Sequence, residues 1–162
     1  MTSTTRSQVM RTNLTLTLRE LHPGRDCKLI WWPFEATAGF NPAWWCRAAH
    51  LNGPIPRYFS VVDGKVEVAR IELEEDVDLA HYGAPELREY ALEIQFIEVH
   101  DHHRGRGIGR EVVRLISKQN PGKSLVALSE DADGFWSSLG WERIDHPDGP
   151  EHYRPLFVQP LR

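Results

Sequence analysis

The sequence predicts a mixed α/β or α+β fold in which helices lie on the faces of a central sheet. Three observations predict it. Residues 57–73 carry a hairpin signal, residues 90–99 are mostly apolar as in a central strand, and residues 108–120 follow with the pattern of an amphipathic helix. Strands that surround and are separated by helices are typical of this class.

Size and composition favour one globular unit. The chain has 162 residues, of which 41% are hydrophobic, so we expect a single domain over residues 13–162 after a flexible tail at residues 1–12. The net charge of -4 excludes a general polyanion binder. No apolar run approaches the roughly 18 residues of a membrane helix. We interpret Cys27 and Cys46 as buried or free thiols and expect a cytoplasmic protein.

The first third of the chain is rich in aromatic residues. Leucines alternate with threonines over residues 14–18, which predicts a half-buried strand. Residues 31–45, named the aromatic segment below, contain four of the six tryptophans. Within it, Asn41 and Pro42 are typical of a helix cap followed by the first helical position.

The hairpin has strands at residues 57–62 and 65–73, and the intervening Asp63-Gly64 pair predicts a tight type I′ turn. An acidic run at residues 72–78 follows, and then a loop through residues 82–85. We interpret the acidic run either as a solvated face or as an attraction for a cationic molecule.

The central strand at residues 90–99 carries a few polar side chains. On a regular strand, Glu93 and Gln95 share one face, whereas Glu98 lies on the other with Phe96. A bulge between them would change the direction of Glu98.

The second half alternates helix and strand. Apolar residues at helical spacing predict a helix from Ile108 that ends at Asn120-Pro121-Gly122. A short buried strand is expected at residues 125–128, and a helix at residues 132–139 closed by Gly140. Two final strands are expected at residues 141–144 and 152–158.

The strongest chemical signal is the stretch Arg104–Arg110, named the glycine loop below. Three glycines in five positions and the start of a helix expose backbone N–H groups that favour a phosphate, and three arginines surround them. The dinucleotide fingerprint GxGxxG fails because Arg110 stands where its last glycine is needed. The alternative is a solvated strand-to-helix turn.

The order Arg-x-x-Gly-x-Gly, here Arg104, Gly107 and Gly109, resembles the coenzyme A loop of the GNAT superfamily of N-acyltransferases. Residues 135–143, FWSSLGWER, resemble the later helix-to-strand signature of that superfamily. The resemblance implies a mixed, mostly antiparallel sheet that is flanked by helices and splayed at the strand that binds acetyl-CoA.

The resemblance also implies acetyl-CoA as cosubstrate, with no metal. Backbone N–H groups of residues 106–109 would hold the pyrophosphate, and the strand through Ile97 and Val99 would pair with the pantetheine arm. Ser129 stands where the family often has Asn. The implied coenzyme-binding residues are Ile97, Val99, Arg104, Gly105, Arg106, Gly107, Ile108, Gly109, Arg110, Ser129 and Trp136.

Glu93 is the candidate general base, since it lies 11 residues before Arg104, as in histone-acetylating members of the superfamily. The alternative for Glu93 is a carboxylate that faces water or pairs with an arginine, and Glu98 is the second candidate base. Trp136 stands where many members have a tyrosine as general acid, and an indole N–H cannot protonate a thiolate. Tyr153, Ser137 or water can substitute, or the thiolate leaves unassisted.

The sequence therefore predicts a GNAT-type N-acetyltransferase that acts in a ternary complex on a small-molecule or peptide amine. The alternative is a non-catalytic acyl-CoA-binding or regulatory module of the same fold. We expect no nucleic-acid or membrane partner, and a monomer or homodimer. The histidines at 100, 102 and 103 are interpreted as solvated loop residues, and the tryptophan pairs as core or as the wall of an acceptor pocket.

Overall fold

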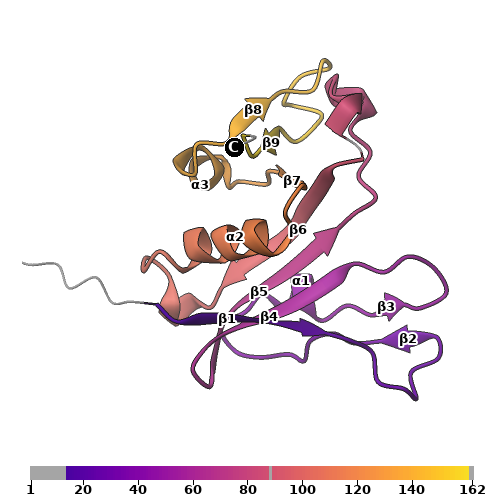
Figure 1. Cartoon of the computed structure of the whole chain (residues 1–162), viewed down its shortest axis with the longest axis vertical. Coiled ribbons are helices and arrows are strands. Elements are labelled where there is room, and N and C mark those ends of the chain that lie inside the picture. Colours follow the sequence, from indigo (N-terminus) through magenta and orange to yellow (C-terminus); the bar gives the residue numbers. More distant parts are fainter. Residues whose placement is uncertain (1–13, 88, 161–162) are drawn as a thin grey trace, which may run out of the picture.

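A computed structural model describes residues 14–87 and 89–160; the predicted tail at residues 1–12 lies outside them. Its main feature is a seven-stranded sheet in the order β1-β4-β5-β6-β7-β9-β8 (Figure 1). Every neighbouring pair in this sheet is antiparallel except β6 and β7, which are parallel. The predicted mixed, mostly antiparallel sheet is confirmed.

The strands of the main sheet are β1 Leu16–Leu21, β4 Arg57–Asp63, β5 Val66–Glu74, β6 Ala91–Val99, β7 Ser124–Leu128, β8 Glu142–Ile144 and β9 Leu156–Val158. A separate ribbon pairs β2 Ile30–Trp31 with β3 Ala49–His50. The α-helices are α1 Pro42–Trp45, α2 Ile108–Gln119 and α3 Asp133–Ser138, and short 3₁₀ turns lie at Ala80–Tyr82, Pro85–Leu87 and Asp101–His103. Within the described ranges, none of the helices is long and apolar enough to span a membrane.

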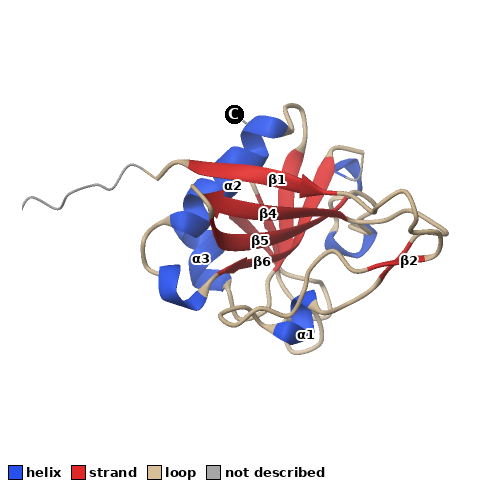
Figure 2. Cartoon of the chain, turned by 90° about the horizontal axis from the view of Figure 1, so that it is seen from below, coloured by secondary structure: helices blue, strands red, loops and turns tan. Residues whose placement is uncertain are grey.

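The two faces of the sheet are covered differently (Figure 2). One face packs against α2 and α3, whose buried residues join the largest apolar cluster of the core. The opposite face is covered by the aromatic segment near β4–β6 and by residues 77–87 near β7 and β9. The buried side chains that α2 and α3 contribute are Ile108, Val112, Val113, Ile116 and Trp136.

A buried arginine holds the aromatic segment to the sheet. The Arg70 guanidinium on β5 lies 4.7 Å from the ring centroid of Phe34 and 4.2 Å from that of Phe40. It also donates to the Glu35 carbonyl at 3.1 Å and to Thr37 Oγ1 at 3.0 Å. The charge is thus both stacked between rings and hydrogen-bonded, which compensates part of the cost of its burial.

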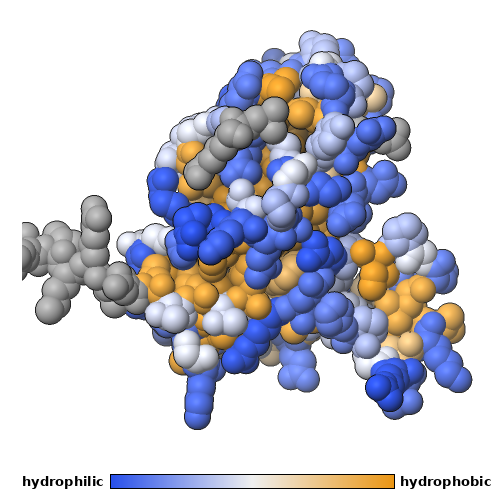
Figure 3. Space-filling view, viewed as in Figure 1, coloured by the Kyte–Doolittle hydropathy of each residue, from blue (hydrophilic) through white to orange (hydrophobic). Residues whose placement is uncertain are grey.

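The β2–β3 ribbon projects from the body and keeps apolar side chains exposed (lower right in Figure 3). Trp45 lies in the core, whereas Trp32, Leu29 and Ile30 remain at least half exposed. The tryptophan pairs therefore divide between core and surface.

Most predicted elements are confirmed, with small shifts at their ends. Asn41 caps α1 by accepting from the Ala43 N–H at 3.0 Å, and Pro42 is its first residue. The first strand begins at Leu16, two residues later than expected. The last strand begins at Leu156 because residues before it form turns with 3.3 Å hydrogen bonds to the Gly149 carbonyl.

The predicted turn of the hairpin is wrong in position and type. Asp63 pairs with Val66, so the two turn residues are Gly64 and Lys65. Only Gly64 has a positive φ, at 63°, whereas a type I′ turn needs positive φ at both residues. Glycine at the first turn position is typical of a type II′ turn.

β6 contains the bulge that would change the direction of Glu98, so the placement expected for a regular strand does not hold. Glu72 lies opposite Phe96 and Leu73 lies opposite Ile94, so Gln95 is the extra residue. The bulge places Glu93, Phe96 and Glu98 on one face, opposite α2. Ile97 and Val99 instead join the core beneath α2.

Strands β6 and β7 separate soon after they begin. Their parallel pairing runs from Ala91 with Ser124 to Glu93 with Val126. Among the described residues, no strand pairs with this edge of β6 beyond Glu93, so the backbone there is left for another partner. The predicted splay of the sheet is confirmed at this point.

We predict that Gly39→Ala destabilises the protein, since Gly39 supports the contact between the aromatic segment and the end of β6. Gly39 has φ of 91°, its carbonyl accepts from the Asp101 N–H at 3.1 Å, and an added Cβ would lie 2.2 Å from His100 Nε2. We expect a loss of at least about 1 kcal/mol in the free energy of unfolding from the backbone strain alone. Denaturant unfolding measures it. Gly53→Ala, which meets nothing within 4 Å, is the control, and equal stability of both variants would contradict the prediction.

Candidate active site

The glycine loop joins β6 to α2 with two glycines in the left-handed region. Gly105 and Gly107 have φ of 73° and 78°, and Gly107 is the N-cap of α2. A Cβ at either position would meet no atom within 4 Å, so these glycines serve the backbone conformation and leave open space above it. The first N–H groups of α2 have no carbonyl partner within the helix and carry its partial positive charge. The loop is therefore suited to bind an anion.

Gly109 connects the two motifs found in the sequence. Its Cα lies so close to α3 that an added Cβ would be 3.1 Å from Phe135 Cε2. Phe135 in turn packs edge-on against Trp136, with ring centroids 4.8 Å apart. The first motif thus needs a glycine here because an aromatic ring of the second motif packs on it.

A cavity of about 300 Å³ lies between the loop, the end of β6 and α3. Its volume is at the lower end of the range for small-molecule sites. The cavity brings together seven of the predicted coenzyme-binding residues, whereas Ile97, Arg106, Ser129 and Trp136 do not line it. Its lining residues are Val99, His103, Arg104, Gly105, Gly107, Ile108, Gly109, Arg110, Phe135 and Ser138.

The three loop arginines differ in their contacts. Arg104 turns back onto β6, where its Nε donates to the Val99 carbonyl at 3.0 Å. Arg110 donates to the Ser138 carbonyl at 2.9 Å, at the C-terminal end of α3. Arg106 Nη1 lies 3.0 Å from His103 Nδ1. All three guanidinium groups thus stay near the cavity and supply positive charge there.

Glu93 lies at the point where β6 and β7 separate. Glu93 is 5% exposed, and the backbone N–H of Leu128, at the end of β7, lies near its carboxylate. With its amide nitrogen turned toward this carboxylate, Gln95 lies 3.1 Å from both oxygens. Burial raises the pKa of Glu93 to about 7; Arg154 acts against this rise, whereas Glu74 and Glu72 add to it.

Two further carboxylates share the face of Glu93. Glu74 lies directly opposite Glu93 in the β5–β6 ladder, and Glu72 lies opposite Phe96. Burial raises the pKa of Glu72, although Arg47 donates to its Oε2 at 2.6 Å. The Arg47 guanidinium also lies 4.6 Å from the Phe96 ring centroid. The guanidinium of Arg47 is therefore a cation that already lies on this face, in contact with the Phe96 ring and the Glu72 carboxylate.

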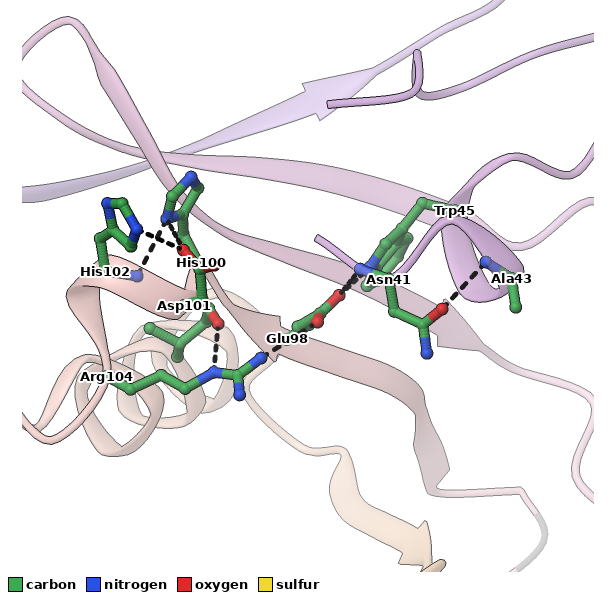
Figure 4. Close-up of polar contacts among 9 residues, drawn as sticks. Asn41, Ala43, Trp45, Glu98, His100, Asp101, His102 and Arg104 are labelled. Atoms are coloured by element: carbon green, nitrogen blue, oxygen red, sulfur yellow. Dashed lines mark hydrogen bonds and ion pairs between the residues drawn. The ribbon is translucent and has the colours of Figure 1, made fainter. Parts of the chain in front are cut away.

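Glu98, the second candidate base, has three donors in the structure. Oε2 accepts from Trp45 Nε1 at 2.6 Å and from the Asn41 N–H at 2.9 Å, and Oε1 accepts from Arg104 at 3.3 Å (Figure 4). Its carboxylate is occupied by groups of the protein itself.

Trp136 and Tyr153 lie in different surroundings. Trp136 is 3% exposed and stacks on Trp141 with ring centroids 4.8 Å apart, so it belongs to the core. Tyr153 is half exposed and stacks on His146 at 3.7 Å. Tyr153 and Ser129 line a second cavity, of about 560 Å³, beyond the end of β7. Ser129 Oγ is 2.5 Å from Asp133 Oδ1.

The histidine cluster is held by local contacts. His100 packs edge-on against Phe40 at 5.1 Å, and its Nδ1 accepts from the His102 N–H at 3.2 Å. Within residues 14–87 and 89–160, no group of three or more His, Cys, Asp or Glu side chains is arranged to hold a metal ion. Cys27 and Cys46 are free, as predicted.

Sequence reasoning placed Gln95 on the face of Glu93 but missed Glu74 and Arg47 as neighbours of that face. Glu72 and Glu74 alternate with apolar residues, which is a signal for one shared face. Their position opposite β6 depends on the strand register, and Arg47 arrives from a distant segment, so no local pattern could identify them.

No protein-family model matches the chain, and no curated protein matches it in sequence. Solved structures do match. An acetyltransferase from Thermus thermophilus superposes with a TM-score of 0.52 and 19% identity over 68% of this chain and 67% of its own. The Bacillus subtilis N-acetyltransferase YlbP in complex with coenzyme A superposes with a TM-score of 0.49 and 19% identity, over 67% of this chain and 71% of its own. Arabidopsis thaliana NAA60 in complex with acetyl-CoA superposes with a TM-score of 0.49 and 12% identity, over 90% of this chain and 98% of its own.

The likeness to the Thermus acetyltransferase covers 68% of this chain at 19% identity. At this identity the likeness concerns the fold alone, and the chain therefore shares the fold of that acetyltransferase.

Proposed function

We propose that the protein is an N-acetyltransferase that moves an acetyl group from acetyl-CoA to a primary amine within a ternary complex. The observation that carries the proposal is Glu93, a buried carboxylate with a raised pKa at the opening between β6 and β7. A carboxyl group titrating near neutral pH is suited to general base catalysis. The glycine loop supports the proposal because its left-handed glycines and the start of α2 are suited to bind an anion on the α2 side of β6.

In the proposed complex the loop residues 106–109 bind the pyrophosphate through backbone N–H groups, and Arg104, Gly105 and Arg110 border it. The free edge of β6, through Ile97 and Val99, pairs with the pantetheine arm. Val99 offers its N–H, since its carbonyl already accepts from Arg104. Ser129 and Trp136 then act indirectly, because they hold α3 in place behind the pantetheine arm. Ser129 does so through its hydrogen bond to Asp133, and Trp136 through its packing in the core. The thioester would reach the face that carries Glu93.

The reaction follows from this placement. Glu93 takes a proton from the acceptor ammonium, directly or through water, and the neutral nitrogen attacks the thioester carbon. A main-chain N–H on the free edge of β6 stabilises the oxyanion that forms. When the C–S bond breaks, the amide is released and the thiolate takes up a proton. Tyr153 is the proposed donor, because the Trp136 indole is buried in the core and its N–H is not acidic.

The face that carries Glu93 favours a cationic acceptor. Glu72, Glu74 and Glu93 lie together there, and the site next to Phe96 already accommodates the guanidinium of Arg47. An ammonium group approaching this face would be attracted before it is deprotonated. The amine of a small molecule and the amine of a peptide both fit this description.

A non-catalytic acyl-CoA-binding module is the second candidate, and the buried Trp136 in place of an acid favours it. Both candidates require coenzyme binding; only the enzyme releases free thiol when acetyl-CoA is mixed with amines.

We predict that acetyl-CoA stabilises the protein and that Gly107→Leu abolishes this effect, since the new side chain would fill the space above the loop. At a ligand concentration of 100 times Kd, the gain for the unaltered protein is about 2.7 kcal/mol. Gly122→Leu is the matched control, because Gly122 also has a positive φ and open surroundings but lies beyond the other end of α2. Thermal unfolding of each variant with and without acetyl-CoA measures the stabilisation by the ligand. Equal stabilisation of the two variants would contradict the assignment of the loop.

We predict that kcat/KM for an amine substrate rises tenfold per pH unit below about pH 7 and then levels, because Glu93 must lose its proton. Glu93→Gln should lower the rate by about 10²–10⁴-fold and remove this break. Glu74→Gln is the control: it removes a neighbouring negative charge and should move the break to lower pH without abolishing it. Free-thiol release against pH is the measurement. An unchanged profile in Glu93→Gln would exclude Glu93 as the base.

We also predict that Glu93→Gln is more stable than the unaltered protein at pH 8. The pKa of Glu93 is raised in the folded state, so folding loses stability as pH rises from the unfolded value of 4.5 to about 7. The full cost above pH 7 is on the order of 3 kcal/mol. Gln carries no charge, so the Glu93→Gln variant does not lose this stability. Denaturant unfolding should show a gap in the free energy of unfolding between the two proteins that is large at pH 8 and much smaller at pH 5; a gap of equal size at both would argue against the raised pKa.

A further inference from the structure

The Glu98 carboxylate joins two parts of the molecule that are far apart in sequence. It is 8% exposed and accepts from the Asn41 N–H, from the Trp45 indole and from the Arg104 guanidinium (Figure 4). Arg104 is the first residue of the glycine loop, whereas Asn41 and Trp45 are the cap and the last residue of α1. One buried charge therefore serves both the loop and the aromatic segment.

The aromatic segment borders the face that carries Glu93. Trp45 lies 6.2 Å from Phe96 and 5.0 Å from Phe34 between ring centroids, and Trp44 lies 5.4 Å from Phe96. Phe96 is on the same side of β6 as Glu93, as shown by the bulge. The contacts of Glu98 thus reach from the proposed coenzyme side to the proposed acceptor side.

The three donors are not independent of one another. Hydrogen bonds to a charged group are stronger than those between neutral groups, and a buried carboxylate that loses one donor depends more strongly on the others. Asn41 and Trp45 share Oε2, whereas Arg104 holds Oε1. The Arg104 side chain is 60% exposed, so it is the member of this set with the most freedom to move.

We infer that Glu98 is a positioning residue that couples the glycine loop to the aromatic segment, so that coenzyme bound in the loop steadies α1 beside the acceptor. The inference rests on the proposed function for the identity of the loop's ligand. An anion held by the N–H groups of residues 106–109 restricts the loop backbone, and with it Arg104. Arg104 then stays against Oε1, and the carboxylate stays in place for Asn41 and Trp45. The coupling is reciprocal, as any linkage between sites must be.

The test is amide hydrogen exchange at Asn41, whose N–H donates directly to Glu98. We expect saturating coenzyme A to slow this exchange about fivefold or more in the unaltered protein. In Arg104→Gln, at a coenzyme A concentration raised until calorimetry shows saturation, the slowing should be lost. Arg106→Gln is the matched control, because Arg106 belongs to the same loop but contacts His103 instead of Glu98; it should keep the slowing.

Two results would overturn the inference while leaving the proposed function intact. One is coenzyme binding without any slowing at Asn41, and the other is equal slowing in Arg104→Gln and the unaltered protein. Absence of any calorimetric signal with coenzyme A would overturn the proposed function and the inference together. Because Arg104 and Arg106 are both exposed, neither substitution endangers the fold.

Discussion

The bulge at Gln95 is the constraint on which the site depends. Without the extra residue, Glu98 and Phe96 would point toward α2, and a carboxylate would enter the largest apolar cluster of the core. With it, Ile97 and Val99 fill that core, and Glu93, Phe96 and Glu98 form one row on the opposite face. The same displaced row supplies a candidate base, an aromatic wall and the carboxylate that receives Arg104 and Trp45.

The separation of β6 and β7 leaves a free strand edge beside this row of side chains, and the proposed reaction takes place there. The glycine loop and its cavity lie on the α2 side of β6, whereas the glutamates lie on the other side. Beyond Glu93, the edge of β6 that faces β7 has no strand partner among the described residues, so this edge can bind an extended chain. Glu93 is buried at the point where the two strands separate, and Gln95 lies 3.1 Å from its carboxylate oxygens.

The parts of the fold that could be predicted from sequence are those with local causes. The glycine loop and α2 follow from left-handed glycines, a helix start and apolar spacing, and all of these lie within a short stretch. The direction of Glu98 could not be predicted, because a bulge is decided by pairing with β5. The hairpin turn lies one residue later than predicted for a similar reason. The register of β4 and β5 places Gly64, not Asp63, first in the turn. The aromatic segment is held by Arg70 and Glu98, which no local pattern connects to it.

A crystal structure with coenzyme A tests the central claim most directly, namely that the opening between β6 and β7 brings a thioester to Glu93. We predict that the pyrophosphate lies on the N–H groups of residues 106–109 and that the pantetheine arm runs along the free edge of β6. The sulfur should lie within reach of the Glu93 carboxylate through one water or an amine. A coenzyme bound in the cavity beyond β7 with the opening empty, or an arm that ends on the α2 side, would contradict the account.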